Sequence, residues 1–370
     1  MAERPASALR RYSRHLLIPE VGLPGQEKLA AARVLCIGAG GLGSPVLSYL
    51  VAAGVGRLGI MDDDEVDLTN LQRQTLFTTA DIGRHKVEVA AERLHAMNPQ
   101  VAVDPIALRF DATNARELVR LYDVIVDCTD RFESRYLIND ACFLEGKPDV
   151  YGSIFRFDGQ VSVFGIAGAP CYRCLFPEPP LAHTVPTCAE GGVLGVLAGM
   201  VGTLQANETL KLILHIGAPL AGRLALIDAL QGRTREIAFD RDPACRLCSP
   251  AATIRDAIEI ELAEPAFGEM KEIEGDELDA CLRSAVLLDV REPHEAVLGV
   301  VQGAVHIPAS ELEARMHELD TAQAYVLACR VGARSRWALG RLRDAGFGKL
   351  SHLRGGLLAY AARDGEFSLF

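Results

Sequence analysis

The chain has 370 residues, of which 49% are hydrophobic and 24% are charged, and its formal net charge is −11 at pH 7. This length predicts two domains or one large domain, and an acidic chain without a basic stripe is not expected to bind nucleic acid broadly. No stretch approaches the roughly 20 uninterrupted apolar residues of a membrane span, and the N-terminal segment MAERPASALRRYSRH lacks the apolar centre of a signal peptide, so we expect a cytoplasmic protein with no membrane partner.

Apolar runs alternate with helical patterns through the first part of the chain. Four runs predict buried strands, at residues 33–37, 58–62, 101–108 and 122–130. Helices are expected over residues 44–55 and from about Gly83. Strands that alternate with helices are typical of a parallel, doubly wound sheet.

The pattern changes after Lys147. The stretch VYGSIFRFDGQVSVFGI alternates partially and contains glycines, which favours antiparallel strands. A long apolar stretch of small residues from Gly192 to Leu214 then predicts a helix. Together these features predict an α/β fold whose first domain is Rossmann-like with a mixed sheet.

A glycine-rich loop joins the first predicted strand to the first predicted helix. Gly38, Gly40 and Gly43 satisfy the pattern G-x-G-x-x-G, in which glycines let the backbone approach a phosphate and the helix dipole favours the anion. Asp62 ends the next strand, where a carboxylate would bind ribose hydroxyls. This pattern alone is typical of an NAD-dependent oxidoreductase, and that alternative stays open here.

The residues behind the acidic turn DDDEVD favour a triphosphate over a dinucleotide. Candidate phosphate-binding side chains follow this turn, namely Asn70, Arg73, Gln74 and Lys86. A triphosphate needs guanidinium and ammonium partners because it carries more negative charge. Asp130 lies at a predicted strand end, where a carboxylate suits Mg²⁺ held between substrate phosphates. For Arg73 or Lys86 alone, a solvated surface position is an equal alternative.

Four of the ten cysteines form two C-x-x-C pairs, Cys171 with Cys174 and Cys245 with Cys248. Two such pairs predict a structural zinc site with four thiolate ligands, and a redox pair is the minor alternative. The cysteines that lie in apolar runs are predicted to be small buried hydrophobic residues, namely Cys36, Cys128, Cys142 and Cys281.

Cys188 ends the proline-rich segment PEPPLAHTVPTC, which we expect to be a crossover ahead of a helix. A helix N-terminus favours the thiolate, which predicts a reactive cysteine. A half-buried loop residue with no chemical role is the alternative.

A second α/β domain is expected after an acidic linker. We place the first domain at residues 1–249, the linker at 250–272 and the second domain at 273–370, while IEIEL within the linker leaves a short strand open. AVLLDVRE, GAVHIPAS and YVLACR predict strands of the second domain. Cys329 follows the last of them in CRVGARS, where loop amides and a following helix N-terminus would favour an anionic sulfur.

Six stretches together resemble the MoeB/ThiF family over roughly residues 8–249, namely RYSRHLLIPEVG, GAGGLGSP, MDDDEVDLTNLQRQTLF, DCTDRFESRYLIND, YGSIFRFDGQVSVF and PTCAEGGVLG. That family adenylates the C-terminal glycine of ubiquitin-fold sulfur carrier proteins. The resemblance implies ATP in the first domain, with Gly41 in the ATP loop and Asp62 on the ribose. It further implies Arg73 and Lys86 on the phosphates and Asp130 on Mg²⁺.

Two further positions follow from the same resemblance. Arg14, in RYSRH, matches the family arginine that reaches the ATP of the other subunit, which implies a homodimer. Arg131 departs from the family, because an asparagine is expected after DCTD. In the family, the cysteine that matches Cys188 is proposed to attack the activated acyl group or to resolve a disulfide.

The second domain resembles rhodanese sulfurtransferases over residues 273–370. Asp289, Arg291 and Glu292 match its D-V-R-E segment, and GAVHIP matches a second one. Cys329 aligns with the cysteine that carries a persulfide, whose terminal sulfur the loop amides, the helix dipole and the arginines of CRVGARS would stabilise. An inactive docking module is the alternative, but such modules usually lack this cysteine.

Together the two resemblances imply one reaction sequence. ATP would activate the carrier as an acyl-adenylate, and the persulfide on Cys329 would then attack the acyl carbon. Cys188 would cleave the resulting acyl disulfide and free a thiocarboxylate. The expected partners are a ubiquitin-fold carrier ending in Gly-Gly, MoaD-like and serving molybdopterin synthesis, and a sulfur donor that is a cysteine desulfurase or thiosulfate. A ThiS-like, cysteine-forming or tRNA-thiolation carrier and a non-catalytic adaptor are the alternatives.

Overall fold

The computed structural model describes residues 10–181, 191–263, 270–297 and 299–361, which divide into two compact units. Residues 250–262, expected in a linker, pack within the first unit. Ala257 is buried in the cluster that contains Phe110, and Arg116 pairs with Asp256 (Nη1 to Oδ1, 3.0 Å). The stretch IEIEL forms no strand. The short apolar side chain of Ala257 therefore anchors a segment whose acidic composition suggested a solvated linker.

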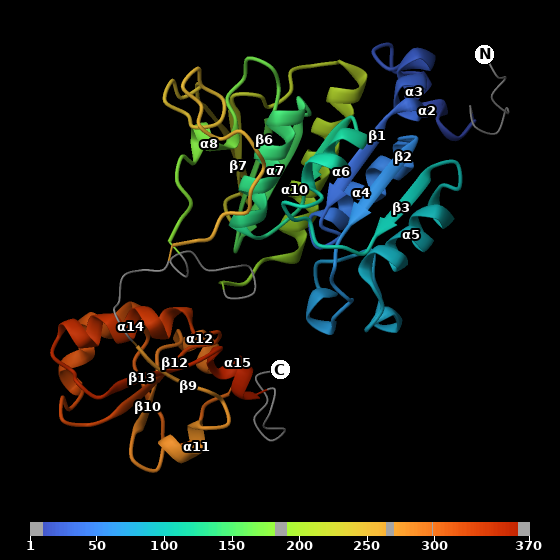
Figure 1. Ribbon diagram of the computed structural model, residues 1–370. Coiled ribbons are helices and arrows are strands. Elements are labelled where there is room, and N and C mark those ends of the chain that lie inside the picture. The colour runs from blue at the N-terminus through green and yellow to red at the C-terminus, as the bar shows by residue number, and fades with distance from the viewer. Residues whose placement is uncertain (1–9, 182–190, 264–269, 298, 362–370) are drawn as a thin grey trace. The chain divides into compact units, whose positions relative to one another are not determined.

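An eight-stranded mixed sheet forms the centre of the first unit, in the order β3-β2-β1-β4-β5-β6-β7-β8 (Figure 1). Its strands are β1 (Arg33–Ile37), β2 (Arg57–Met61), β3 (Ala102–Ile106), β4 (Val124–Asp127), β5 (Asp149–Phe155), β6 (Asp158–Phe164), β7 (Arg223–Asp228) and β8 (Arg233–Ala238). The first five strands run parallel, and β6, β7 and β8 join antiparallel. The mixed Rossmann-like sheet predicted from the sequence is therefore confirmed, but β4 ends at Asp127, so Asp130 lies in the following loop.

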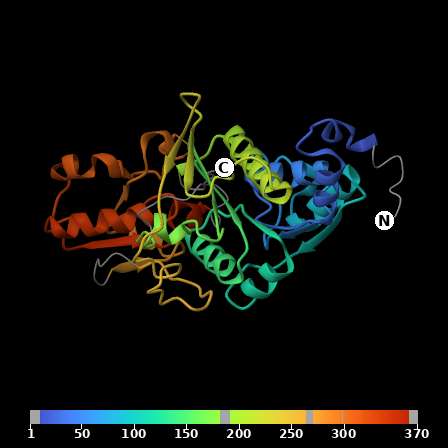
Figure 2. The ribbon, with the colours of Figure 1, turned by 90° about the horizontal axis from the view of Figure 1, so that it is seen from above.

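Helices cover both faces of this sheet. The described helices of this unit are α2 (Ser13–Leu16), α3 (Gly22–Ala31), α4 (Gly43–Ala53), α5 (Lys86–Met97), α6 (Ala115–Leu121), α7 (Phe132–Glu145), α8 (Tyr172–Leu175) and α10 (Gly195–Leu214). One core cluster joins α3, α4, α5 and α10 to the sheet, and another joins α6 and α7. In Figure 2, α10 and α7 lie on opposite sides of the sheet.

Two helices begin three residues later than the sequence predicted. Gly83 and Gly192 have φ of +83° and +77°, which a right-handed helix excludes, so α5 begins at Lys86 and α10 at Gly195. The predicted burial of Cys36, Cys128 and Cys142 is confirmed, whereas Cys281 is partly exposed. Among the described helices, none combines the length and apolarity needed to cross a membrane.

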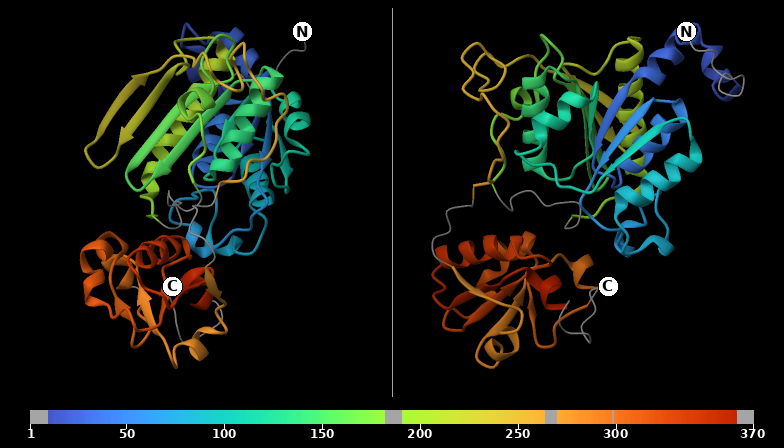
Figure 3. Two further views of the ribbon diagram at one scale, coloured as in Figure 1. Left: turned by 60° about the vertical axis from the view of Figure 1, so that its left-hand side comes forward. Right: turned by 45° about the vertical axis from the view of Figure 1, so that its right-hand side comes forward.

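The second unit has a five-stranded parallel sheet in the order β11-β10-β12-β13-β9. Its strands are β9 (Lys271–Ile273), β10 (Val286–Asp289), β11 (Val305–His306), β12 (Tyr325–Ala328) and β13 (Leu350–Leu353). Its helices are α11 (Leu278–Cys281), α12 (Pro293–Ala296), α13 (Leu312–Arg315), α14 (Ala333–Asp344) and α15 (Gly356–Ala361). One core cluster joins the sheet to α13 and α14 and the other to α11 and α15, so this sheet is also covered on both faces (Figure 3).

Candidate functional site

The glycine-rich loop connects β1 to α4, as the sequence predicted. Gly38 has φ +99°, and a Cβ there would lie 2.8 Å from the carbonyl oxygen of Cys128. A Cβ on Gly43 would lie 2.1 Å from the carbonyl oxygen of Gly38. Only glycine fits either position, because each side chain would collide with rigid backbone. The tight turn leaves the backbone of Gly40 and Gly41 facing a cavity.

This cavity has a volume of about 390 Å³, within the range of small-molecule sites, and it opens at the carboxyl ends of β1, β2 and β4. Most of the residues expected to bind nucleotide line it, namely Gly38, Gly40, Gly41, Asp62, Asn70, Arg73, Gln74, Lys86 and Asp130. Gly43 shapes the turn without lining the cavity, and Arg14 lies on α2 outside it. Parallel strands thus gather side chains from distant parts of the chain at one edge of the sheet.

Asp62 and Lys86 form a charged group on one wall of the cavity. Lys86 is 4% exposed, and its Nζ lies 2.7 Å from Oδ2 of Asp64 and 3.9 Å from Oδ1 of Asp62. Asp62 accepts the backbone N–H of Ala39 at 2.7 Å. Burial raises the pKa of Asp62, and the nearby Lys86 opposes that rise. The carboxylate is therefore fixed against the glycine loop, where ribose hydroxyls can donate to it, while the ammonium of Lys86 has further donors for a phosphate.

Gln74 and Arg73 retain hydrogen-bonding capacity in the same cavity. The Oε1 of Gln74 is buried without a partner in the part of the chain that the structure describes. Arg73 donates from Nη1 to the carbonyl oxygen of Thr69 at 3.1 Å and packs its aliphatic stem over Gly41. Since buried polar groups are nearly always satisfied, the orphaned oxygen indicates a ligand or an ordered water. Arg131, which stands where the family resemblance led us to expect asparagine, also lines the cavity. Its Nη2 lies 3.7 Å from Oε1 of Glu133.

The four cysteines of the C-x-x-C pairs meet, although about 70 residues separate the pairs. Their Sγ atoms all lie within 4.8 Å of one another. The contacts of 3.8 Å (Cys171 to Cys174), 3.6 Å (Cys171 to Cys245) and 3.3 Å (Cys174 to Cys248) are close to the roughly 3.8 Å expected between thiolates around tetrahedral zinc. Burial raises the pKa of Cys171, and that of Cys174 to about 11. A dication would instead favour the thiolates, and the donor set fits zinc.

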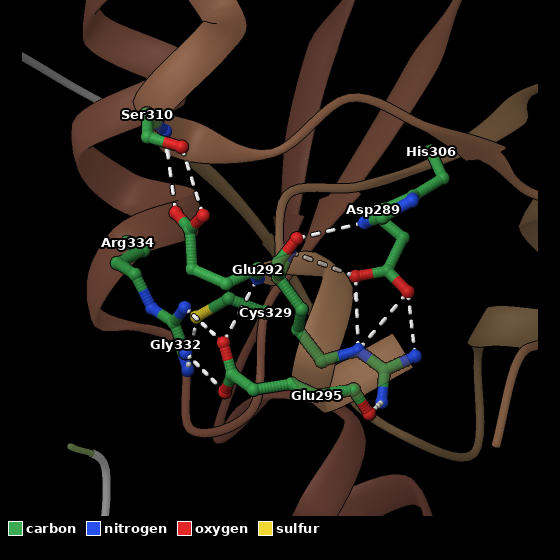
Figure 4. A network of polar contacts seen from close by, with 9 residues as sticks. Asp289, Glu292, Glu295, His306, Ser310, Cys329, Gly332 and Arg334 are labelled. Carbon is green, nitrogen blue, oxygen red and sulfur yellow. Dashed lines mark hydrogen bonds and ion pairs between the residues drawn. The ribbon is translucent and has the colours of Figure 1, made fainter. Parts of the chain in front are cut away.

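Cys329 follows β12 and is completely buried. Its Sγ accepts the backbone N–H of Gly332 at 3.1 Å, as Figure 4 shows. Gly332 has φ +98° and immediately precedes α14, so a left-handed turn directs its amide at the sulfur. The N–H of Leu357 donates to the carbonyl oxygen of Cys329 at 2.8 Å and fixes the other side of the loop. One of the predicted loop amides thus contacts the sulfur, in a turn at the N-terminus of a 12-residue helix.

The arginines of this loop differ in their contacts. Arg334 makes a bidentate ion pair with Glu295, with 2.6 Å between Nη2 and Oε1 (Figure 4). Burial alone would raise the pKa of Glu295, but hydrogen bonds from Arg334 and the backbone hold it below the ordinary value. Arg330 has no ion pair or side-chain hydrogen bond within the described residues. Among the described arginines of this loop, Arg330 is therefore the one whose charge no acidic side chain balances.

Sequence reasoning missed Glu295. Glu292 and Glu295 form a capping box around Pro293 at the start of α12, a signal visible in the sequence EPHE. In the D-V-R-E segment, Arg291 is 1% exposed and pairs with Asp289 (Nη2 to Oδ2, 2.6 Å). Arg291 also donates to the carbonyl oxygen of Gly299 at 2.6 Å, so this buried pair holds the segment around α12 in place. Cys188 lies outside the described residues.

Comparisons with known proteins agree with this geometry. The model of the ThiF family matches residues 12–247, and that of the rhodanese-like domain matches residues 273–363. The sulfur carrier protein adenylyltransferase of Thermus thermophilus is 51% identical over 259 residues, covering 68% of this chain and 95% of the relative. The probable adenylyltransferase/sulfurtransferase MoeZ of Mycobacterium tuberculosis is 44% identical over 375 residues, covering 96% of this chain and 95% of the relative.

A solved structure shows the same fold. The crystal structure of E. coli MccB with ATP aligns with a TM-score of 0.57 at 24% identity and covers 65% of this chain and 74% of that chain. The named relatives favour adenylyl transfer over the NAD-dependent oxidation that the glycine loop alone left open.

Proposed function

This chain belongs to the ThiF family and carries a rhodanese-like domain, and we propose that it adenylates the C-terminal glycine of a ubiquitin-fold sulfur carrier protein and then transfers sulfur to it. The observation that carries this proposal is the presence, in one chain, of a nucleotide cavity and of a cysteine held by a loop amide. The chain is thus a transferase with two successive activities.

The first step joins the carrier to AMP. A carboxylate oxygen of the carrier attacks the α-phosphorus of ATP, and pyrophosphate leaves. The residues present fit this reaction, with Asp62 on the ribose, the glycine loop, Arg73 and Lys86 on the phosphates, and Asp130 as the carboxylate for Mg²⁺. Mg²⁺ held there would neutralise charge on the departing pyrophosphate. Catalysis rests mainly on positioning and charge stabilisation by these side chains.

The second step moves sulfur. The terminal sulfur of a persulfide on Cys329 attacks the acyl carbon and expels AMP, which leaves an acyl disulfide. The thiolate of Cys188 attacks the Cys329 sulfur, releases the carrier thiocarboxylate and leaves a disulfide between the two cysteines, which a two-electron reductant must reset. The buried loop around Cys329 supports this role by donating an amide to the sulfur.

Further parts of the proposal concern metal, assembly and pathway. Zinc on the four clustered cysteines would be structural, because four thiolates leave no open position.

Arg14 would complete the ATP site of a partner subunit in a homodimer. We propose a MoaD-like carrier in molybdopterin synthesis, with a cysteine desulfurase or thiosulfate as sulfur donor, in the cytoplasm.

The test is a reconstitution with the full chain. The protein is incubated with a MoaD-type carrier, ATP, Mg²⁺ and thiosulfate, and the carrier is examined by mass spectrometry. We expect a mass gain equal to the exchange of one oxygen for sulfur, and carrier-dependent exchange of pyrophosphate into ATP. If the carrier does not stimulate exchange of pyrophosphate into ATP, the proposed adenylation step is wrong.

A further inference from the structure

Arg135, on α7, is a buried arginine at the edge of the cavity, and its guanidinium forms no ion pair with the residues that the structure describes. It lines that cavity and is only 6% exposed. Its guanidinium lies over the rings of Phe132 and Tyr151, 5.1 and 5.6 Å from their centroids. Its Nε is buried without a hydrogen bond, and no ion pair of Arg135 occurs in the part of the chain that the structure describes.

A second buried arginine of the same unit, Arg173, has an acidic side chain hydrogen-bonded to its guanidinium. Arg173 is also 6% exposed and lies 4.7 Å from the ring centroid of Tyr136. Its Nε and Nη2 donate to the two oxygens of Asp140, at 2.8 and 2.7 Å. Both arginines contact one aromatic cluster, but only Arg135 lacks an acid across its fork. Because buried polar groups are nearly always hydrogen-bonded, this contrast indicates that the fork of Arg135 is left to bind a ligand.

The charges around Arg135 restrict the kind of anion. Burial alone would lower the pKa of Arg135, but Tyr151, Tyr172 and the carboxylates of Asp127 and Asp130 hold it above the ordinary value. The side chain is therefore a cation whose charge Asp127 and Asp130 already balance in part. A singly charged ligand suits the charge that is left, and the planar guanidinium fork matches a carboxylate in two-point contact.

The position of Arg135 also separates it from the groups expected to bind nucleotide. Asp62 follows β2, the glycine loop follows β1, and Asp130 lies in the loop after β4. Arg135 stacks on Tyr151 of β5, the next strand along, where Ile154 also lines the cavity. The ligand of Arg135 would thus enter beyond the phosphate loop, on the side opposite Asp62.

We propose that Arg135 binds the C-terminal carboxylate of the carrier protein and holds it beside the ATP site. This inference rests on the proposed function and assigns the carrier's reacting group to a named residue. Once the acyl-adenylate forms, the carboxylate charge at Arg135 is lost. Arg135 therefore contributes more to binding of the carrier than to the chemical step, and its removal raises the KM for the carrier more than it lowers kcat.

The experiment uses the full chain and a MoaD-type carrier that ends in Gly-Gly, prepared with a free acid or an amide at its C-terminus. The dissociation constants of both forms are measured for the native chain, Arg135→Gln and Arg135→Lys. The native chain binds the acid form roughly 10- to 100-fold more tightly than the amide, as expected for charge-assisted hydrogen bonds. Arg135→Gln binds both forms equally, and Arg135→Lys retains part of the preference.

Two measurements keep a folding defect apart from a binding defect. The MgATP affinity and the thermal midpoint of Arg135→Gln are compared with those of Arg120→Gln. Arg120 is an exposed arginine that pairs with Glu145, at the other end of the helix α7 that carries Arg135. Unchanged MgATP affinity in Arg135→Gln together with loss of the acid preference supports the inference. An undiminished acid preference in Arg135→Gln overturns it, while carrier-dependent pyrophosphate exchange by the native chain leaves the proposed function intact. If the native chain itself shows no such exchange, the proposed function fails first.

Discussion

The backbone N–H of Gly332 points at the sulfur of Cys329, 3.1 Å away, from a residue with φ +98°. This geometry depends on glycine, because a left-handed conformation costs other residues roughly 1–2 kcal/mol. A Cβ on Gly332 would lie 3.4 Å from the backbone nitrogen of Gly355, an ordinary van der Waals contact, so the cost of a side chain here comes from the backbone conformation.

Gly332→Ala should therefore lower thiosulfate sulfurtransferase activity about 10-fold or more while the domain stays folded. Gly346→Ala is the matched control, because Gly346 has φ +94° with no atom near its Cβ position and lies away from the loop. Both variants should lose similar stability in thermal unfolding. Equal activity in the two variants would contradict a role for the Gly332 amide.

The ion pair between Glu295 and Arg334 predicts an acid-sensitive second unit. The pKa of Glu295 lies below its ordinary value when folded, so its stabilising effect is fully present above the unfolded pKa of about 4.3. The effect is lost as the pH falls further, through the lowered folded pKa. Glu295→Gln should unfold about 1–3 kcal/mol more easily at neutral pH, with a smaller loss of stability on acidification, measured by urea unfolding from pH 7 to pH 3.

Glu313→Gln is the control for that measurement, because Glu313 is exposed and its pairing with Arg341 is a surface ion pair. Such pairs contribute about 0–1 kcal/mol. If the two glutamine variants show the same pH dependence of stability, the pair of Glu295 and Arg334 stabilises the second unit no more than a surface ion pair does.

Chain order and sheet topology were enough to predict that the candidate nucleotide-binding residues gather in one cavity at the edge of the sheet. Gly38–Gly43, Asp62 and Asp130 follow three neighbouring parallel strands, so the sequence placed them at one edge. The spacing of the cysteine pairs likewise predicted a cluster that the structure brings together.

The partner of each buried arginine was not predictable. Arg135 and Arg173 look alike in sequence, and only the fold shows that Asp140 pairs with Arg173. The pair of Glu295 and Arg334 spans 39 residues, and no local pattern selects that glutamate over its neighbours. The packing of residues 250–262 depends on Ala257, whose burial a polar, acidic composition conceals.

Metal removal should unfold the first unit. We expect one zinc per chain by metal analysis, and Cys171→Ser or Cys248→Ser should lower both the zinc content and the thermal midpoint of the first unit, because metal-binding energy is also folding energy. A chelator should reproduce the effect and added zinc should reverse it. If metal analysis finds no zinc in freshly purified protein, this prediction is wrong.

Asp130→Ala should separate the two activities. Asp130 lines the nucleotide cavity and Cys329 belongs to the other unit, so loss of the carboxylate should reduce carrier-dependent pyrophosphate exchange about 100-fold or more. Thiosulfate sulfurtransferase activity should remain nearly unchanged in the same preparation. Parallel loss of both activities in a folded variant would contradict this division of labour.

Cys329→Ala should stop thiocarboxylate formation and leave carrier-dependent pyrophosphate exchange intact. Adenylation needs no sulfur, because the nucleophile is the carrier's own carboxylate and the residues proposed for ATP all precede Cys171. The transfer step needs a thiol that can carry a second sulfur atom, which alanine lacks. Cys281→Ala, which removes a partly exposed cysteine of the same unit, serves as the control.

Free bisulfide should partly restore thiocarboxylate formation by Cys329→Ala, because it can attack the acyl-adenylate directly. Rescue should need a high concentration, since a free nucleophile loses the advantage of a positioned one, worth up to ~7–11 kcal/mol in well-aligned cases. Mass spectrometry of the carrier distinguishes the outcomes. If Cys329→Ala makes thiocarboxylate from thiosulfate at the native rate, sulfur reaches the carrier by another route, and the loop around Cys329 has a different purpose.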